Sequence, residues 1–143
     1  MKVLLTLLAF ALLGAGAPAS AQSESKKPAS IALKGNDPVS YFNPGTPAKG
    51  TSKLNFDFDD SRYYFSTPKN RELFAANPDR YAPQFTGLCA TGLSMGMKAE
   101  ADPGMFLVKD GKLYVFSSVE AREMAQKDPA LLGRAHQAWT QAK

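Results

Sequence analysis

The first 21 residues place the strongest constraint on the fold, because they have the composition of a removable export segment. One positive charge, at Lys2, precedes a nearly uninterrupted apolar run over residues 3–13, and small residues at 19–21 form a cleavage motif. The run is shorter than the about 20 apolar residues that cross a bilayer. We therefore expect residues 1–21 to be a signal peptide, the mature chain to start at Gln22, and the protein to be periplasmic or secreted.

Removal of this segment leaves enough chain for one domain, which has to be stable without a disulfide. The full chain has 143 residues and a single cysteine, Cys89, so a hydrophobic core has to provide the stability. Residues 22–30 are polar and predict a flexible linker, with the domain proper over 31–143. The chain has no dense basic run and no later apolar segment of membrane length. We therefore expect no nucleic-acid partner and, after cleavage, no membrane contact.

The first half of the mature chain predicts a hairpin followed by a capped helix. Apolar and polar residues alternate over 54–59, as in a half-buried strand, and the aromatic-rich stretch 62–65 is expected to be the returning strand. Thr67 is followed by a proline, a typical start of a helix. Leu73 and Phe74 are expected to face the core from this helix.

The second half predicts another hairpin and two more helices. Asp110 and Gly111 form a strong signal for a tight turn between strands 106–109 and 112–116. Ser117 and Glu120 have the spacing of a capping box that opens a helix to about residue 127. A final helix begins after Pro129, with three residues on one apolar face: Leu131, Ala135 and Trp139.

Paired strands that alternate with short helices predict the fold class. We expect an α+β fold, a small single domain with antiparallel hairpins packed against short helices. The sequence shows no second domain and no internal repeat.

Several motifs in this order resemble those of the exported YHS-domain proteins. The resemblance covers roughly residues 31–139 and rests on five segments: K-G-N-D-P-V-S-Y-F at 34–42, Y-Y-F-S at 63–66 continuing to N-P at 77–78, G-x-C-A-x-G at 87–92, D-P at 102–103 and D-G-K-L-Y at 110–114. It implies the fold of that family and a non-catalytic binding or accessory module. The ligand of such a module is a metal ion, a small molecule or a protein partner.

The resemblance also bears on metal binding. Related YHS domains occur beside heavy-metal-transporting ATPases, and their metal-associated form carries three thiols that suit a soft ion. In this sequence Ser40, Ser66 and Asn70 stand at those three positions. Hydroxyl and carboxamide groups do not replace thiolates for soft metals, so the resemblance predicts that this particular site is lost.

Cys89, Met95 and Met97 form the one alternative metal site that the residues suggest. Thiol and thioether sulfurs are ligands for a soft metal ion such as copper, which exported proteins encounter. Cys89 alone also allows a second function, a thiol-dependent redox protein or enzyme. A third interpretation makes Cys89 a small buried apolar side chain in a glycine-rich bend.

Two further sequence patterns resemble active-site motifs, but their sequence context favours a structural role. Ser94 lies in a G-x-S-x-G pattern with His136 downstream, but the segment before it is not a buried strand, as a nucleophile elbow requires. His136 has no carboxylate partner in the sequence pattern and is expected to be a surface residue near a helix end. We nominate no catalytic residue.

The same holds for two candidate binding patterns. In the aromatic strand, Tyr63 and Phe65 are expected in the core and Tyr64 on the opposite face, rather than as a ligand platform. Asp59 and Asp60, close to Asp57, are expected to form a turn, because they lack the ligand spacing of a calcium loop.

Overall fold

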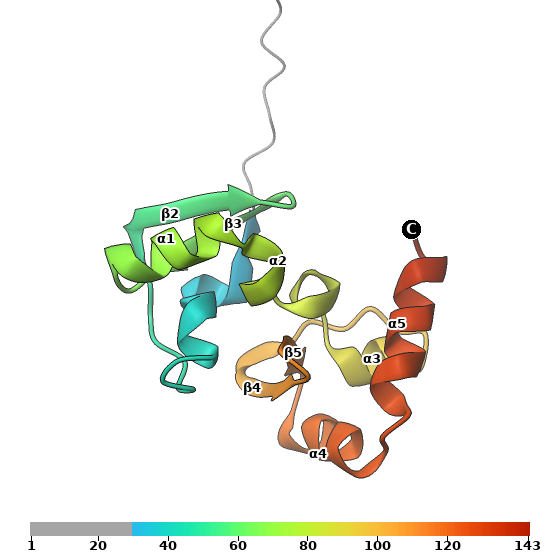
Figure 1. The fold of residues 1–143 in the computed structure, drawn as a ribbon. Coiled ribbons are helices and arrows are strands. Elements are labelled where there is room, and N and C mark those ends of the chain that lie inside the picture. The colour runs from blue at the N-terminus through green and yellow to red at the C-terminus, as the bar shows by residue number, and fades with distance from the viewer. Residues whose placement is uncertain (1–29) are drawn as a thin grey trace, which may run out of the picture.

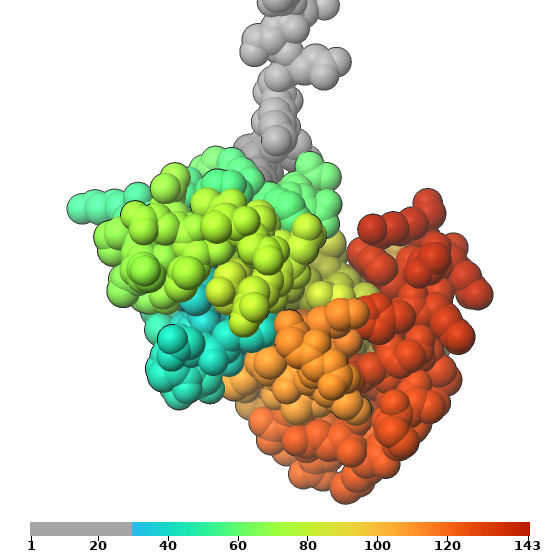
Figure 2. Space-filling view, in the orientation of Figure 1, coloured from blue at the N-terminus to red at the C-terminus, as the bar shows by residue number. Residues whose placement is uncertain are grey.

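The computed structural model describes residues 30–143. The predicted signal peptide, 1–21, and nearly all of the predicted linker, 22–30, lie outside the described residues. The described part is a small α+β domain with two small sheets and short helices, as predicted (Figure 1). In space it forms two lobes that follow each other along the chain, with the N-terminal half at the upper left and the C-terminal half at the lower right and along the right side in Figure 2.

The N-terminal lobe contains three strands and four short helical segments. In chain order they are β1 (Ser30–Ile31), the 3-10 helices η1 (Ala32–Gly35) and η2 (Pro38–Tyr41), β2 (Thr51–Phe58), β3 (Ser61–Phe65), α1 (Pro68–Ala76) and α2 (Pro78–Tyr81). The strands form one sheet of order β1-β3-β2. Strands β2 and β3 are the predicted hairpin, and α1 packs across it.

The C-terminal lobe repeats this order around a two-stranded sheet. The elements are the 3-10 helix η3 (Gln84–Gly87), α3 (Ala90–Ser94), β4 (Asp102–Lys109), β5 (Lys112–Phe116), α4 (Val119–Lys127) and α5 (Leu131–Gln141). The last helix, α5, is longer than the other helices that the structure describes and packs on α3 and α4.

The two lobes are structural repeats of each other, so the prediction of no internal repeat was wrong. Each hairpin has the same register and the same irregularity near the start of its first strand. The matched strand pairs, which lie 51 residues apart (102 against 51, 116 against 65), are Thr51–Phe65 with Asp102–Phe116, and Asn55–Tyr64 with Phe106–Val115.

The turn that precedes each helix–hairpin unit is repeated as well. In η1 the backbone of Leu33, Lys34 and Gly35 is left-handed, with φ values of 50°, 49° and 82°. In η3 the three residues 85–87 have φ values of 57°, 54° and 82°. Left-handed conformations cost non-glycine residues roughly 1–2 kcal/mol each, so both turns are held in place by the packing around them.

The core divides between the lobes in the same way. Phe74 of α1 is the centre of the N-terminal cluster and contacts the rings of Tyr63 and Phe65. This confirms the predicted inward positions of Tyr63 and Phe65. Leu73, however, is exposed, because Phe74 alone of the pair points at the hairpin.

Helix caps agree with the sequence except at one position. Thr67 caps α1 as predicted by accepting a hydrogen bond from the backbone N–H of Asn70. The cap of α4 is Ser118, which accepts from the N–H of Ala121, rather than the predicted Ser117. The reason is that the structure uses Ser117 differently, as a partner of Cys89.

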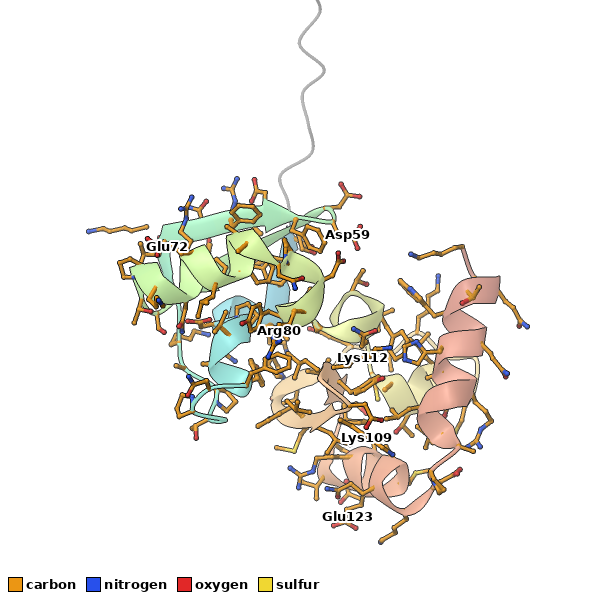
Figure 3. All side chains as sticks on the ribbon, viewed as in Figure 1. Asp59, Glu72, Arg80, Lys109, Lys112 and Glu123 are labelled. Atoms are coloured by element: carbon orange, nitrogen blue, oxygen red, sulfur yellow. The ribbon has the colours of Figure 1, made fainter. Side chains whose placement is uncertain are left out.

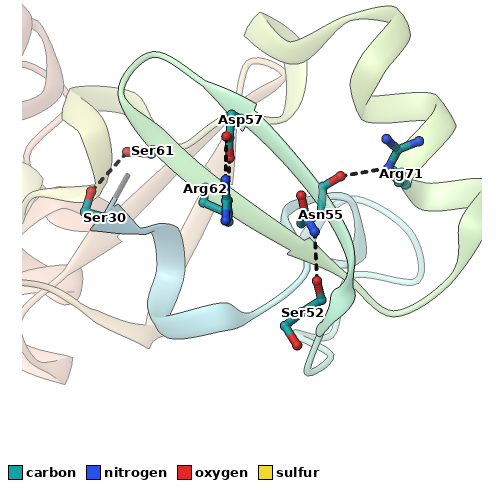
Figure 4. Close-up of polar contacts among 7 residues, drawn as sticks. All are labelled: Ser30, Ser52, Asn55, Asp57, Ser61, Arg62 and Arg71. Atoms are coloured by element: carbon teal, nitrogen blue, oxygen red, sulfur yellow. Dashed lines mark hydrogen bonds and ion pairs between the residues drawn. The ribbon is translucent and has the colours of Figure 1, made fainter. Parts of the chain in front are cut away.

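Surface contacts hold the N-terminal hairpin in register. Arg62 forms a bidentate ion pair with Asp57 across the two strands, at 2.7 and 2.8 Å. Arg71 of α1 donates to the carbonyl of Asn55 and ties the helix to β2 (Figure 4). Asp57 therefore serves the hairpin rather than a calcium site.

Tyr41 joins the two lobes. Its ring packs edge-on against Phe106 of β4, with 4.9 Å between ring centroids, and its hydroxyl donates to the carbonyl oxygen of Pro103. Both partners belong to the C-terminal lobe, so this buried residue fixes how the lobes meet.

Candidate functional site

A buried carboxylate lies where η2 begins. Asp37 is fully buried and caps η2 by accepting the N–H of Val39 at 2.9 Å. Its other oxygen accepts the N–H and the hydroxyl of Ser66, at 2.9 and 2.7 Å, and the amide of Asn70 at 2.7 Å. The hydroxyl of Ser40 donates to the carbonyl oxygen of Asp37.

The three positions that the YHS resemblance singles out therefore converge on one residue. Ser40, Ser66 and Asn70 all direct donors at Asp37. A carboxylate surrounded by N–H and O–H donors is an internal hydrogen-bond acceptor, and its lone pairs are engaged by protein groups. The arrangement ties the 34–42 segment to the end of β3 and to α1.

Cys89 occupies the equivalent position in the C-terminal lobe. It is 1% exposed and caps α3, where its sulfur accepts the N–H of Gly92 at 3.4 Å. The sulfur also accepts the N–H of Ser117 at 3.3 Å, and its thiol donates to the hydroxyl of Ser117 at 3.5 Å. Ser117 follows β5 as Ser66 follows β3, so a thiol and a carboxylate perform the same capping role in the two lobes.

Met95 and Met97, the other members of the predicted sulfur site, lie at the surface. Their side chains are 55% and 53% exposed, whereas Cys89 is enclosed. Within residues 30–143 there is no group of three or more His, Cys, Asp or Glu side chains placed to hold a metal ion. Metal binding by Cys89, Met95 and Met97 stays a prediction.

His136 has a partner that the sequence pattern did not reveal. Its Nε2 lies 3.0 Å from the hydroxyl of Tyr114 on β5, and its ring packs edge-on against Phe85. Partial burial, together with the positive charge of Lys112, lowers the pKa of His136 below its ordinary value. The contact attaches α5 to the hairpin and places the imidazole in a packing role.

The remaining candidates have structural roles. Ser94 is the last residue of the five-residue helix α3 and donates to the carbonyl of Thr91. Asp59 and Asp60 form the hairpin turn with left-handed backbone, at φ values of 48° and 59°. Figure 3 labels Asp59 on the upper lobe and Lys112 on the lower lobe, and both residues are exposed.

A cleft with a volume of about 330 Å³ opens at the junction of the lobes. Both left-handed turns border it: η1 provides one wall, and Thr86 and Gly87 of η3 provide another. Its apolar lining comes from both halves of the chain and includes Ile31, Leu33, Leu88, Ala101 and Val115.

Two opposite charges belong to the lining of this cleft. Nζ of Lys34, in the N-terminal lobe, lies 3.5 Å from Oε1 of Glu100, in the C-terminal lobe. Sequence reasoning nominated neither as a binding residue, because 66 positions separate them (34 against 100) and Lys34 was noted only as the first residue of the 34–42 motif. A usable signal lay in the repeat, because the turn that carries Lys34 recurs at residues 85–87 and Glu100 forms a bridge with Leu88, directly after that second turn.

Comparisons with protein-family models, with curated proteins and with solved structures found no match to this chain. Within residues 30–143, no helix is both long enough and apolar enough to cross a membrane.

Proposed function

We propose that this chain is an exported, YHS-like binding module that holds a small ligand in the cleft between its two lobes. The observation that carries the proposal is the cleft itself, because both halves of the chain contribute its walls. Its volume of about 330 Å³ falls in the range of small-molecule sites.

The positions of the reactive groups support a binding role over a redox role. The sulfur of Cys89 and the carboxylate of Asp37 are both buried and both engaged by backbone N–H groups. Each group therefore stabilises its own lobe. The cleft, in contrast, has exposed side chains at its edge, among them Ile31 and Lys34.

The proposal is tested by a titration of the ¹⁵N-labelled protein with indole and p-cresol, followed by backbone amide shifts. Saturable shifts are expected at cleft residues such as Leu33, Ala101 and Val115. The variant Ile31→Asp should lose them, because it adds a charge to the apolar wall. Leu73→Asp is the matched control. It makes the same kind of change at an exposed apolar residue of α1, outside the cleft lining, and this variant should bind both probes normally. Shifts that are absent, or that survive Ile31→Asp, contradict the proposal.

A further inference from the structure

We propose that the ligand of the junction cleft is a small zwitterion with an apolar body, of the class of a free apolar amino acid, bound by its ammonium group at Glu100 and its carboxylate at Lys34. This inference rests on the proposed binding function and adds the chemical class of the ligand. It comes from the placement of one positive and one negative side chain at a cleft whose other lining residues are mostly apolar, with Ser30, Ser61 and Thr86 as the polar exceptions.

The Lys34–Glu100 pair is built across the junction, with one charge from each lobe. Lys34 belongs to the left-handed turn η1, whose backbone is fixed by the hydrogen bond from Asn36 N–H to the carbonyl of Leu33. Glu100 forms an isolated antiparallel bridge with Leu88, which follows η3. Both backbones are therefore held, while both side chains remain free to move.

The Lys34–Glu100 ion pair is too weak to be what holds the two lobes together. The two side chains are 59% and 83% exposed and their charged atoms lie 3.5 Å apart. Exposed pairs of this kind contribute about 0–1 kcal/mol to stability. A ligand that carries both charges can therefore separate the pair at little cost and give each side chain a new partner of opposite sign.

The neighbouring charges leave these two groups as the available pair. Lys49 donates to the carbonyl oxygen of Lys34 and is not part of the cleft lining. A ligand with a carboxylate alone would draw Lys34 from Glu100 and leave Glu100 to water, and a ligand with an ammonium alone would leave Lys34 to water, whereas a zwitterion gives both side chains a new partner.

The cleft volume favours a small ligand. A volume of about 330 Å³ lies at the lower end of the range of small-molecule sites, about 300–1,000 Å³. The ligand to test is therefore small, with its apolar part towards the apolar lining, which includes Ile31 and Leu33. L-Leucine has this size and character and is the probe for the experiment.

Three matched probes test the inference by amide-shift titration of the whole protein: L-leucine, 4-methylvalerate, which lacks the amine, and 3-methylbutylamine, which lacks the carboxylate. L-Leucine is expected to bind at least tenfold more tightly than either analogue. Lys34→Glu and Glu100→Lys should each weaken leucine binding at least tenfold, and the double variant should recover part of it because both charges are present again. The matched control is Lys127→Glu, which breaks an exposed pair with Glu123 on α4 and should leave binding unchanged.

The outcomes separate this inference from the proposed function. If indole shifts the cleft amides but leucine binds no better than its two analogues, the zwitterion assignment is wrong and the binding cleft stands. If leucine binds equally well to the two single charge-reversal variants, the assignment is also wrong. If neither leucine nor the apolar probes shift the cleft amides, both proposals fail together.

Discussion

Replacing Asp37 with alanine should produce one of the largest losses of stability that a single change in this protein can cause. The carboxylate accepts four hydrogen bonds, from Val39 N–H, Ser66 N–H, Ser66 Oγ and the amide of Asn70. The two side-chain donors are partly exposed and can turn to water. The two backbone donors cannot leave the site.

The expected magnitude follows from those two backbone groups. Ser66 N–H, left without its acceptor, costs about 1–3 kcal/mol, and the loss of the η2 cap, which is the bond from Val39 N–H, costs about 1 kcal/mol. We therefore expect Asp37→Ala to lower the free energy of unfolding by about 2–4 kcal/mol. The equivalent change in the other lobe, Cys89→Ala, removes a weaker sulfur acceptor and should cost about 1–2 kcal/mol.

Urea unfolding followed by far-UV circular dichroism measures both changes, with Trp139 fluorescence as a second probe in the C-terminal lobe. Asp79→Ala, an exposed position at the start of α2, is the control and should change stability by less than about 0.5 kcal/mol. A loss below about 1 kcal/mol for Asp37→Ala, with an unchanged denaturant slope, would refute the view that this carboxylate holds the N-terminal lobe together.

Four other predictions concern the thiol of Cys89, the titration of His136 and Tyr63, and the predicted signal peptide. Cys89 should resist alkylation in the native protein and react only as the protein unfolds, because its side chain is enclosed; fast native alkylation would restore the redox alternative. Burial lowers the pKa of His136 below its ordinary 6.5, so the folded state binds this proton less readily than the unfolded state. The free energy of unfolding should therefore fall as pH drops below about 6.5. His136→Gln should make the free energy of unfolding less dependent on pH in that range. Burial raises the pKa of Tyr63 from 10.0 to about 12; its stabilising contribution is complete below pH 10 and is lost as pH rises towards 12, so Tyr63→Phe should lessen alkaline unfolding. N-terminal sequencing of the native protein should begin at Gln22 if residues 1–21 are the predicted signal peptide, and recovery of Met1 would contradict that prediction.

Local patterns were enough to predict most elements of the fold. The turn at Asp110 and Gly111 and the cap at Thr67 are short-range features whose geometry depends on a few neighbouring residues. The exposed position of Leu73 was missed because two adjacent apolar residues on a helix cannot both face one hairpin, and periodicity alone did not choose between them.

The repeat and the cleft were not predictable in the same way. The two capping residues, Asp37 and Cys89, differ chemically although each caps a helix and accepts the N–H of the equivalent serine, Ser66 or Ser117. The spacing between matched residues is 52 at the left-handed turns of η1 and η3 and 51 in the hairpins. A search of the sequence for a repeat of one fixed length therefore misses part of the match. The pairing of Lys34 with Glu100 depends on how two lobes meet, and no local pattern encodes that.

The repeated lobe has a consequence for how the chain folds. A unit of about fifty residues is close to the lower limit for folding alone, because so small a chain buries a modest share of its surface. Each lobe also completes its core against the other, as Tyr41 does against Phe106. One polypeptide that carries both lobes makes this association intramolecular, so folding of the pair does not depend on protein concentration.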